Sequence, residues 1–430
     1  MAKEIVLLLT VDSLRRDHVG CYHGQSLTPF LDTFAEGSTV FEGACSQGGG
    51  TPESFRSIMF SLPPPLSLDE RHVHGKESIA KVLREAGYAT GGFHSNPFLS
   101  SHFGYDEGFE TFFDGGGKQT GDATLLGDLG NAASIALMNR GPATDGKEIT
   151  SRALEWAKGA RSPAFLWVHY MDTHFPYLPP ARMQGWRGSL RNRVAWDMLM
   201  ARKIQAKAGE PSEGVRSRVM SSYRLCVREV DSYISTLIEG VWKHFDRRLV
   251  VMTADHGEGF WEHGRFGHGG VYDEILRVPL IVNSTGAGPG RRVQGLAPLA
   301  DIKPTILRQA GLAQDGGLPL ATGEAVTPGR KLVCASLDPP DGTRTLGFRS
   351  ELMKYIRKES LDGSKCASEE LYDLVRDPGE RMDVLADRKE EGSAARAGLE
   401  EVLARGVTQA LVDKSDESEV ARRLHALGYD

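Results

Sequence analysis

Cysteine and long apolar runs are both scarce in this chain. Its 430 residues include five cysteines, which are widely spaced and form no Cys-x-x-Cys pair of the kind found in zinc or redox sites. The apolar run at residues 5–9 is too short for a signal peptide or a membrane span. We therefore expect a cytoplasmic protein with reduced thiols and no membrane span.

Basic charge is not in excess either. The 51 lysines and arginines are outnumbered by 57 aspartates and glutamates, and the net charge is -6. A nucleic-acid partner requires a basic face, so we expect no such partner. A small anionic substrate is compatible with this balance, because its site needs only a few local charges or a metal. No pattern in the sequence predicts an oligomeric state.

Short aliphatic runs without polar alternation recur along the chain and are separated by helical patterns. Such runs are typical of strands that are buried on both faces of a parallel sheet. Strands are predicted at residues 4–10, 164–170, 248–253 and 278–283, and helices at 78–86, 148–158 and 217–240. The alternation predicts a mainly parallel α/β sheet, and 430 residues are enough for one large domain and a small one.

The pattern changes after about residue 323. Short strand-like runs and a closing helix at 388–403 predict a small α+β subdomain. We accordingly predict a catalytic domain at 1–325 and a C-terminal subdomain with a terminal helix at 326–430. A basic segment at 181–215 is predicted to be a helical insert, which is compatible with both a substrate lid and a solvated surface element.

Polar residues stand at the carboxyl ends of the first three predicted strands. Asp12 follows the first strand, His169 and His174 lie at the end of the second, and Asp255 and His256 follow the third. In open α/β sheets, ligands bind at this edge. This shared position predicts a functional site.

A loop rich in glycine and histidine, ADHGEGFWEHGRFGHGG, follows the third strand. Asp255 and His256 offer a hard oxygen ligand and an imidazole, and His263 and His268 lie further along the loop. Glycines let the backbone approach a ligand closely. Aspartate and histidine suit Mn²⁺, Zn²⁺ or Mg²⁺, whereas Ca²⁺ prefers oxygen ligands alone.

Three further residues each allow a structural and a functional interpretation. Asp12 is either a metal ligand or the N-cap of the next helix. Thr51, in GGGTPESF, is either a nucleophile at a helix N-terminus or a cap. His174 either binds a substrate oxygen or acts as a general acid, or it is held by Asp172 in a supporting position.

Six segments that include these residues are similar, in order along nearly the whole chain, to sulfatases of the alkaline phosphatase superfamily. They include TVDSLRRDHVGCYHGQSLTPFLDTFAEG, FLWVHYMDTHFPYLPP, the block from ADHGE to RVPLIV, and ELYDLVRDPGE. The resemblance implies an alkaline-phosphatase-like α/β/α sandwich with a mainly parallel central sheet and a small C-terminal α+β subdomain.

The resemblance also implies a metal site, a nucleophile and basic residues around the transferred group. The implied metal ligands are Asp12, Asp255, His256 and the oxygen of Thr51, which is also the implied nucleophile. The histidines expected at the transferred group or the leaving oxygen are His174, His263 and His268. One divalent metal is implied, with Ca²⁺ or Mn²⁺ expected first and Mg²⁺ or Zn²⁺ next.

The chain departs from the family at its nucleophile. Sulfatases typically carry Cys-x-Pro-x-Arg or Ser-x-Pro-x-Arg, whose first residue is oxidised to formylglycine, but here TPESFR runs from Thr51 to Arg56. Threonine cannot supply the aldehyde hydrate, and no formylglycine is expected. Ser13 replaces a second acidic ligand, and Ser95 and Asn96 stand where the family has a lysine.

We therefore predict a metal-dependent hydrolase of small anionic esters, either sulfate esters or phosphate and phosphonate esters. Thr51 is predicted to attack through a covalent intermediate. The candidate substrate contacts are Arg56, Ser95, Asn96 and His169. Threonine nucleophiles are familiar in the phosphoryl-handling branches of the superfamily, so a phosphodiesterase or phosphoryl-group transferase is the first alternative. An inactive binding protein on the same fold is the second.

Overall fold

The computed structural model describes residues 2–24, 27–115, 144–179, 211–286, 290–312, 317–320 and 326–405. The predicted insert at 181–215 lies outside the described residues as far as residue 210, and so does the chain after residue 405. In the described part, no helix is both long enough and apolar enough to cross a membrane.

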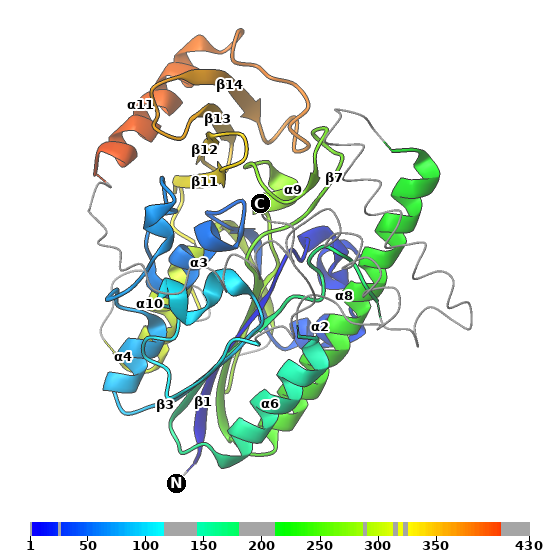
Figure 1. The fold of residues 1–430 in the computed structure, drawn as a ribbon, viewed down its shortest axis with the longest axis vertical. Coiled ribbons are helices and arrows are strands. Elements are labelled where there is room, and N and C mark those ends of the chain that lie inside the picture. The colour runs from blue at the N-terminus through cyan, green and yellow to red at the C-terminus, as the bar shows by residue number, and fades with distance from the viewer. Residues whose placement is uncertain are drawn as a thin grey trace, which may run out of the picture.

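An eight-stranded sheet forms the centre of the molecule (Figure 1). Its strands in spatial order are β10 (Arg291–Pro298), β2 (Thr39–Cys45), β9 (Leu280–Ser284), β6 (Arg247–Ala254), β1 (Glu4–Val11), β5 (Ala164–Tyr170), β3 (Ala89–Phe93) and β4 (Thr111–Phe113). All neighbours run parallel except β9, which is antiparallel to β2 and β6. The prediction of a mainly parallel sheet is therefore confirmed.

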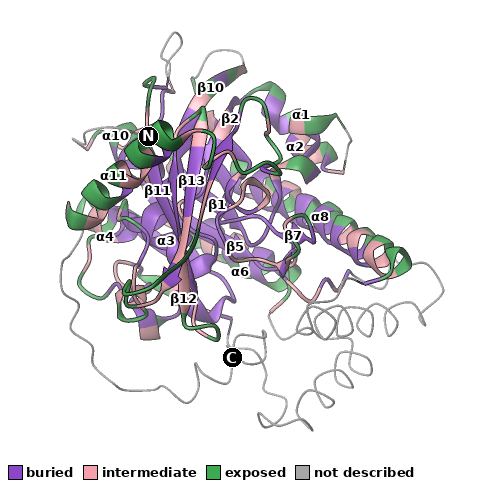
Figure 2. Cartoon of the chain, turned by 90° about the horizontal axis from the view of Figure 1, so that it is seen from above, coloured by how far each residue is buried: buried purple, intermediate pink, exposed green. Residues whose placement is uncertain are grey.

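Helices cover both faces of this sheet, which gives the predicted α/β/α sandwich (Figure 1). One face carries α2 (Pro29–Glu36), α6 (Gly146–Gly159) and α8 (Glu213–Trp242), and the other carries α3 (Thr51–Phe60), α4 (Ile79–Glu85) and α10 (Ile302–Gln309). Short elements are α1 (Gly20–His23), α9 (Asp273–Leu276), the hairpin of β7 (Gly259–Phe260) and β8 (Phe266–Gly267), and the 3₁₀ turns Arg16–His18, Asp69–Arg71, Pro97–Leu99, Ser101–Phe103 and Leu299–Asp301. The strands β1, β5 and β6 at the middle of the sheet are almost entirely buried, and exposed residues lie mainly on the outer elements (Figure 2).

A second, antiparallel sheet lies beyond the carboxyl ends of the central strands (Figure 1). It consists of β11 (Leu332–Asp338), β12 (Thr343–Arg349), β13 (Met353–Ser360) and β14 (Cys366–Asp373), and α11 (Lys389–Arg405) packs on it through the buried Leu399. Its first strand reaches the turn before α3: Ala335 donates to the carbonyl of Gln47 (3.0 Å) and accepts from the amide of Gly49 (2.9 Å). The small sheet therefore contacts the loops at the carboxyl edge directly.

A fully buried lysine fastens the same sheet to the loop that follows β6. Lys354 Nζ lies 2.7 Å from Asp273 Oδ1 and 2.6 Å from Glu380 Oε1, and it donates to the carbonyl of Val271 (2.8 Å). Arg349 makes two further 3.1 Å contacts with Asp273. Burial alone would lower the pKa of Lys354, but the carboxylates of Asp273 and Glu380 raise it above its ordinary value. We name the group Lys354, Arg349, Asp273 and Glu380 the buried charge cluster.

Candidate active site

The carboxyl ends of β1 and β6 and the start of α3 bring four buried polar residues together. Asp12, Asp255 and His256 each offer a ligand atom, and these atoms all lie within 4.8 Å of one another. The Thr51 hydroxyl lies 3.0 Å from Asp255 Oδ2, 3.2 Å from Asp12 Oδ2 and 3.5 Å from His256 Nε2. The structure thus assembles the four residues that the sequence analysis grouped, at the edge where it placed them.

Thr51 is held at this point by the turn before α3. It is the first residue of the helix, Gly50 is the N-cap, and Pro52 follows at a position where proline starts a helix well. A Cβ atom on Gly48 would lie 2.2 Å from the amide of Ser54, and one on Gly49 would lie 2.2 Å from the carbonyl of Gly270. These two glycines are needed because the turn approaches both its own helix and the loop that carries His268.

His256 is oriented so that one ring nitrogen faces the cluster. Its Nδ1 lies 2.9 Å from the carbonyl of Gly257, and a carbonyl can only accept, so this nitrogen carries the proton. Nε2, which carries no proton in the neutral imidazole, then faces Thr51, 3.5 Å from Asp255 Oδ2 and 3.8 Å from Asp12 Oδ1. This is the tautomer that a metal ligand requires.

Ser13 holds both carboxylates of the cluster. Its hydroxyl donates to Asp12 Oδ1 (2.9 Å) and its amide donates to Asp255 Oδ1 (3.2 Å). Its φ of 57° lies in the left-handed region, which is uncommon for serine and is found where surrounding contacts enforce it. The residue that replaces an acidic ligand of the family therefore orients the two remaining acids.

Asn96 points its amide nitrogen at the Thr51 hydroxyl. Its Oδ1 accepts from the amide of Phe98 (2.9 Å), which fixes the amide so that Nδ2 lies 2.9 Å from Asp12 Oδ2 and 3.2 Å from Thr51 Oγ1. His169 lies on the other side of Asp12, with Nε2 3.4 Å from Oδ2 and Nδ1 3.0 Å from the hydroxyl of Thr10. His169 is fully buried against Phe55, so it supports Asp12 and does not line an open pocket.

Two further histidines and a buried glutamate complete the surroundings. The His268 ring centroid is 4.7 Å from that of His256 and 5.0 Å from that of His174. Glu258 is fully buried, and its Oε1 lies 3.7 Å from His268 Nδ1. Glu258 was not predicted as a site residue. Its place in the ADHGE segment was the only signal, and the sequence does not show that its carboxyl group turns inward.

The electrostatics of the cluster reflect two carboxylates in a buried space. Burial and the neighbouring Asp12 raise the pKa of Asp255 above its ordinary value. Burial would also raise the pKa of Asp12, but His174, His169 and His256 hold it well below its usual range. The pKa of His174 is lowered to about 4, mainly by burial and also by His268, while Asp12 opposes the change. Burial raises the pKa of Glu258 to about 7 against the effect of His174 and His256.

This donor set fits a divalent cation. Two carboxylates and an imidazole with a free Nε2 are ligands that such ions accept, and a cation between the carboxylates would relieve the repulsion that raises the pKa of Asp255. Among the described residues, no other group of three such side chains comes as close together. The site can therefore hold one metal ion through Asp12, Asp255 and His256, with the Thr51 oxygen beside it.

Three predicted residues are placed elsewhere. His263 Nδ1 contacts Glu274 (2.7 Å), its Nε2 contacts the carbonyl of Glu380 (3.0 Å), and its ring stacks on Tyr272. His263 therefore fastens the β7–β8 hairpin to the small subdomain, and this position does not favour the predicted transfer of a proton to the leaving oxygen.

Arg56 and Ser95 also have structural partners in place of the expected substrate contacts. Arg56 donates to the carbonyls of Pro63 (3.1 Å) and Glu70, and so holds the segment after α3. The Ser95 hydroxyl donates to the carbonyl of Thr144 (3.1 Å). Neither side chain has a described contact with the cluster.

The sandwich and the cluster at its carboxyl edge define the class of protein: an ester hydrolase of the alkaline phosphatase superfamily. The sulfatase family model matches residues 4–312, which is most of the chain. The chain belongs to the sulfatase family.

Individual relatives include both sulfatases and phosphonate hydrolases. Iduronate 2-sulfatase of Mus musculus is 24% identical over 385 residues, which cover 71% of this chain and 68% of that protein. The phosphonate monoester hydrolase of Agrobacterium radiobacter has a similar fold, with a TM-score of 0.68 at 19% identity over 95% of this chain and 97% of that one. A solved structure in complex with its substrate D-glucosamine-2-N,6-O-disulfate has a TM-score of 0.70 at 17% identity over 94% and 98% of the two chains.

Proposed function

We propose that the protein hydrolyses a small anionic sulfate ester, or a phosphate or phosphonate ester, with Thr51 as the nucleophile and one divalent metal. The position of the Thr51 hydroxyl carries this proposal. It is fully buried and lies within 3.5 Å of Asp12, Asp255, His256 and Asn96. A hydroxyl beside a set of candidate metal ligands is placed where a bound cation would lower its pKa and so activate it as a nucleophile.

Each residue of the site has its own role in the proposed reaction. A divalent cation, when bound, lowers the pKa of a hydroxyl and neutralises oxyanion charge. The Thr51 hydroxyl gives up its proton to solvent, its oxygen attacks the sulfur or phosphorus atom in line, and the bond to the leaving oxygen breaks. Asn96 Nδ2 donates to a non-bridging oxygen, and a substrate oxyanion beside His174 would favour the protonated form of this imidazole, which can then donate as well. His268 donates a proton to the leaving oxygen. Water then cleaves the Thr51 ester and restores the hydroxyl.

A phosphodiesterase or phosphoryl-group transferase is the second candidate. The observation in its favour is Thr51 itself, because threonine lacks the aldehyde hydrate through which sulfatases expel sulfate. The similarity in fold to a phosphonate monoester hydrolase is compatible with it but shows the fold alone.

Steady-state rates on four chromogenic esters test the proposal. The substrates are p-nitrophenyl sulfate, p-nitrophenyl phosphate, bis(p-nitrophenyl) phosphate and p-nitrophenyl phenylphosphonate, each assayed with Ca²⁺, Mn²⁺, Mg²⁺ and Zn²⁺. The substrate with the highest kcat/KM identifies the ester class, and formation of glycerol phosphate in the presence of glycerol identifies a transferase. No turnover of any ester with any metal would favour an inactive binding protein.

Metal binding should also be visible without turnover. Adding Mn²⁺ or Ca²⁺ to chelator-treated protein at pH 7.5 should raise its melting temperature, because a ligand at 100 times its Kd stabilises the folded state by about 2.7 kcal/mol. The increment should shrink as the pH falls, because Asp255, whose pKa is raised, must lose its proton to bind the cation. Differential scanning fluorimetry at several pH values measures both effects.

The matched control for metal binding is Asp255→Asn. It removes one ligand and one of two like charges, so the metal-free protein should fold while the increment from the metal largely disappears. An increment of the same size in this variant would show that the ion binds elsewhere.

A further inference from the structure

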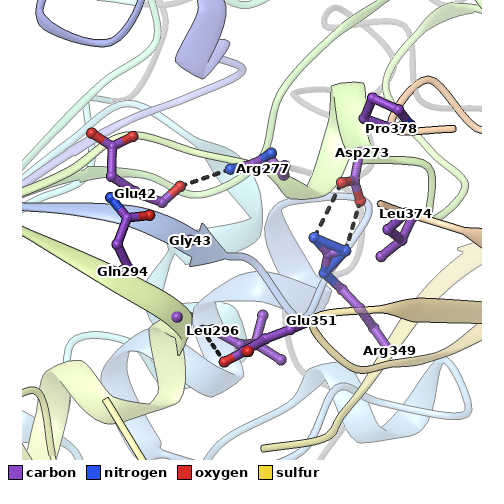
Figure 3. A pocket seen from close by; sticks show the side chains of 11 residues that line it. Glu42, Gly43, Asp273, Arg277, Gln294, Leu296, Arg349, Glu351, Leu374 and Pro378 are labelled. Carbon is purple, nitrogen blue, oxygen red and sulfur yellow. Dashed lines mark hydrogen bonds and ion pairs between the residues drawn. The ribbon is translucent and has the colours of Figure 1, made fainter. Parts of the chain in front are cut away.

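A cavity of about 400 Å³ lies between the two sheets, on the side of β2 and β10 (Figure 3). Glu42 and Gly43 of β2 and Gln294 to Leu296 of β10 form one wall, and Asp273 and Arg277 form the second. Arg349, Glu351 and Leu374 of the small subdomain close it. The lining includes none of Asp12, Thr51, Asp255 and His256, which we call the Thr51 cluster. The volume is within the range of small-molecule sites.

A bulge in β10 shapes the floor of this cavity. The pairing of β10 with β2 shifts between Val293 and Leu296, and Gly295 has a φ of 99°. A Cβ atom on Gly43 would lie 2.1 Å from the Gly295 carbonyl, so the two strands approach each other here more closely than a side chain allows. The absence of a side chain at Gly43 therefore permits the bulge of β10 at this point.

Two of the carboxylates that line the cavity already have cationic partners. Glu42 pairs with Arg16 (2.5 Å) and with Arg292. Asp273 belongs to the buried charge cluster, where Arg349 and Lys354 contact it. Both the Glu42 and the Asp273 carboxylates therefore already form ion pairs with other residues.

Arg277 is a cation of this wall that forms no ion pair with a carboxylate among the described residues. Its Nη2 donates to the carbonyl of Glu42 (2.7 Å), its Nε is buried without a hydrogen-bond partner, and no described carboxylate forms an ion pair with it. Burial, Arg16 and Arg349 lower the pKa of Arg277, and Asp273 opposes this change. Figure 3 shows the guanidinium of Arg349 held by Asp273 across the same space.

The opposite side of the cavity offers an acceptor. Glu351 is exposed, and its Oε1 accepts only weakly from the amide of Leu296, at 3.3 Å. No described lysine or arginine pairs with it. The lining thus places a partly buried cation without an ion pair on one side of the cavity and an exposed carboxylate without an ion pair on the other.

We propose that this cavity binds a small polar molecule that carries a carboxylate or phosphate group. The oxyanion contacts the guanidinium of Arg277, whose planar fork of donors matches either group. Hydroxyl or amino groups of the ligand face Glu351 and Gln294. The site does not depend on the function proposed for Thr51. Because Leu276, the neighbour of Arg277, accepts from the amide of Ser46 (2.8 Å), the site adjoins the chain that leads to the nucleophile turn.

Calorimetric titration of the metal-loaded protein tests this site. The probes are inorganic phosphate and D-gluconate, with sorbitol as an uncharged control. We expect one or both anions to bind and sorbitol not to bind. Arg277→Gln should weaken the binding about 10- to 100-fold, because it removes charged hydrogen bonds. Tighter binding of gluconate would identify a carboxylate ligand, and tighter binding of phosphate would identify a phosphate ligand.

Two control variants separate the cavity from other anion sites. Arg376→Gln removes an equal charge from a side chain that is 78% exposed and lies outside the lining, so it should leave the affinity unchanged. His256→Gln alters the Thr51 cluster and should also leave the affinity of the cavity unchanged. Binding that survives Arg277→Gln but is lost in His256→Gln would overturn the proposal, as would binding of neither anion.

A third variant keeps the test decisive if Arg277→Gln does not fold. Glu351 is exposed at the rim, so Glu351→Lys should fold normally and add a positive charge to the cavity. The affinity for phosphate should then rise at least about threefold. An unchanged phosphate affinity in this variant would contradict an anion site here.

Discussion

Thr51→Ala should lower kcat/KM for the preferred ester by at least about 10³-fold. Removing a nucleophile abolishes the covalent route and leaves only the catalysis that binding and charge stabilisation provide. The hydroxyl lies between Asp255 and Asp12, and no other described hydroxyl is placed at the same point of the cluster. Initial rates over a substrate series, at saturating metal, measure this loss.

The matched control for the nucleophile is Thr51→Ser. Both substitutions delete the buried methyl group, but serine keeps the hydroxyl, so it should retain activity within about tenfold of the native enzyme. Metal-dependent stabilisation should persist in both variants, because Asp12, Asp255 and His256 remain. If the alanine variant keeps its turnover, or if the serine variant loses as much activity as the alanine variant, the nucleophile is not Thr51.

Asp273→Asn should destabilise the folded protein by about 3 kcal/mol at pH 7. Removing one partner of a buried ion pair leaves the other charges uncompensated, and Lys354 and Arg349 both depend on this carboxylate. Glu380 still pairs with Lys354, so we expect the lower end of the usual range. Urea denaturation followed by circular dichroism gives the free energies of unfolding.

The pH dependence of this difference has a definite sign. Burial would raise the pKa of Asp273, but Lys354 and Arg349 lower it below its ordinary value. A lowered carboxyl pKa stabilises the fold above the unfolded-state pKa of about 4, and the stabilisation is lost as the pH falls further. The difference between the native protein and Asp273→Asn should therefore be complete above pH 4 and should disappear as the pH falls toward about 2, the pKa of Asp273 in the folded protein. Asp341→Asn, which removes an exposed carboxylate 3.9 Å from Lys358, should cost less than about 1 kcal/mol at any pH.

The candidate metal ligands could be grouped from the sequence because they stand at the ends of apolar strands. Asp12 and Asp255 each follow a buried run directly, and parallel strands bring their carboxyl ends to one edge whatever the length of chain between them. Residue type and strand position therefore sufficed for these residues. Thr51 needed the family resemblance as well, because a threonine at a helix start is more often a cap.

Side-chain direction could not be predicted in the same way. His263 and His268 are five residues apart in one glycine-rich loop, yet one faces the small subdomain and the other faces His256. The reversal occurs in the β7–β8 hairpin, where Trp261 and Gly264 both have positive φ. A tight turn of this kind is set by tertiary contacts, so the spacing of the histidines does not reveal it.

Several strands were missed for physical reasons that the structure makes clear. β3 reads ATGGF, and glycine disfavours a strand, but a Cβ atom on Gly91 would lie 2.7 Å from the ring of Trp156. β10 reads RRVQGLAP at the polar edge of the sheet and contains a bulge. The antiparallel direction of β9 is likewise absent from the sequence, because an apolar run does not encode the direction of its strand.

The backbone pairing between Ala335 and the turn before Thr51 limits how the molecule can be divided. A fragment that ends with the family match at residue 312 would keep every side chain of the Thr51 cluster. It would lose the strand that hydrogen-bonds to Gly49 and the Ser336 hydroxyl that accepts from the Gly270 amide. The geometry of the site therefore depends on residues beyond the segment that contains its side chains. A chimera that exchanges the small sheet for that of a relative must therefore preserve the backbone register of β11, even where no residue of that strand touches the ester.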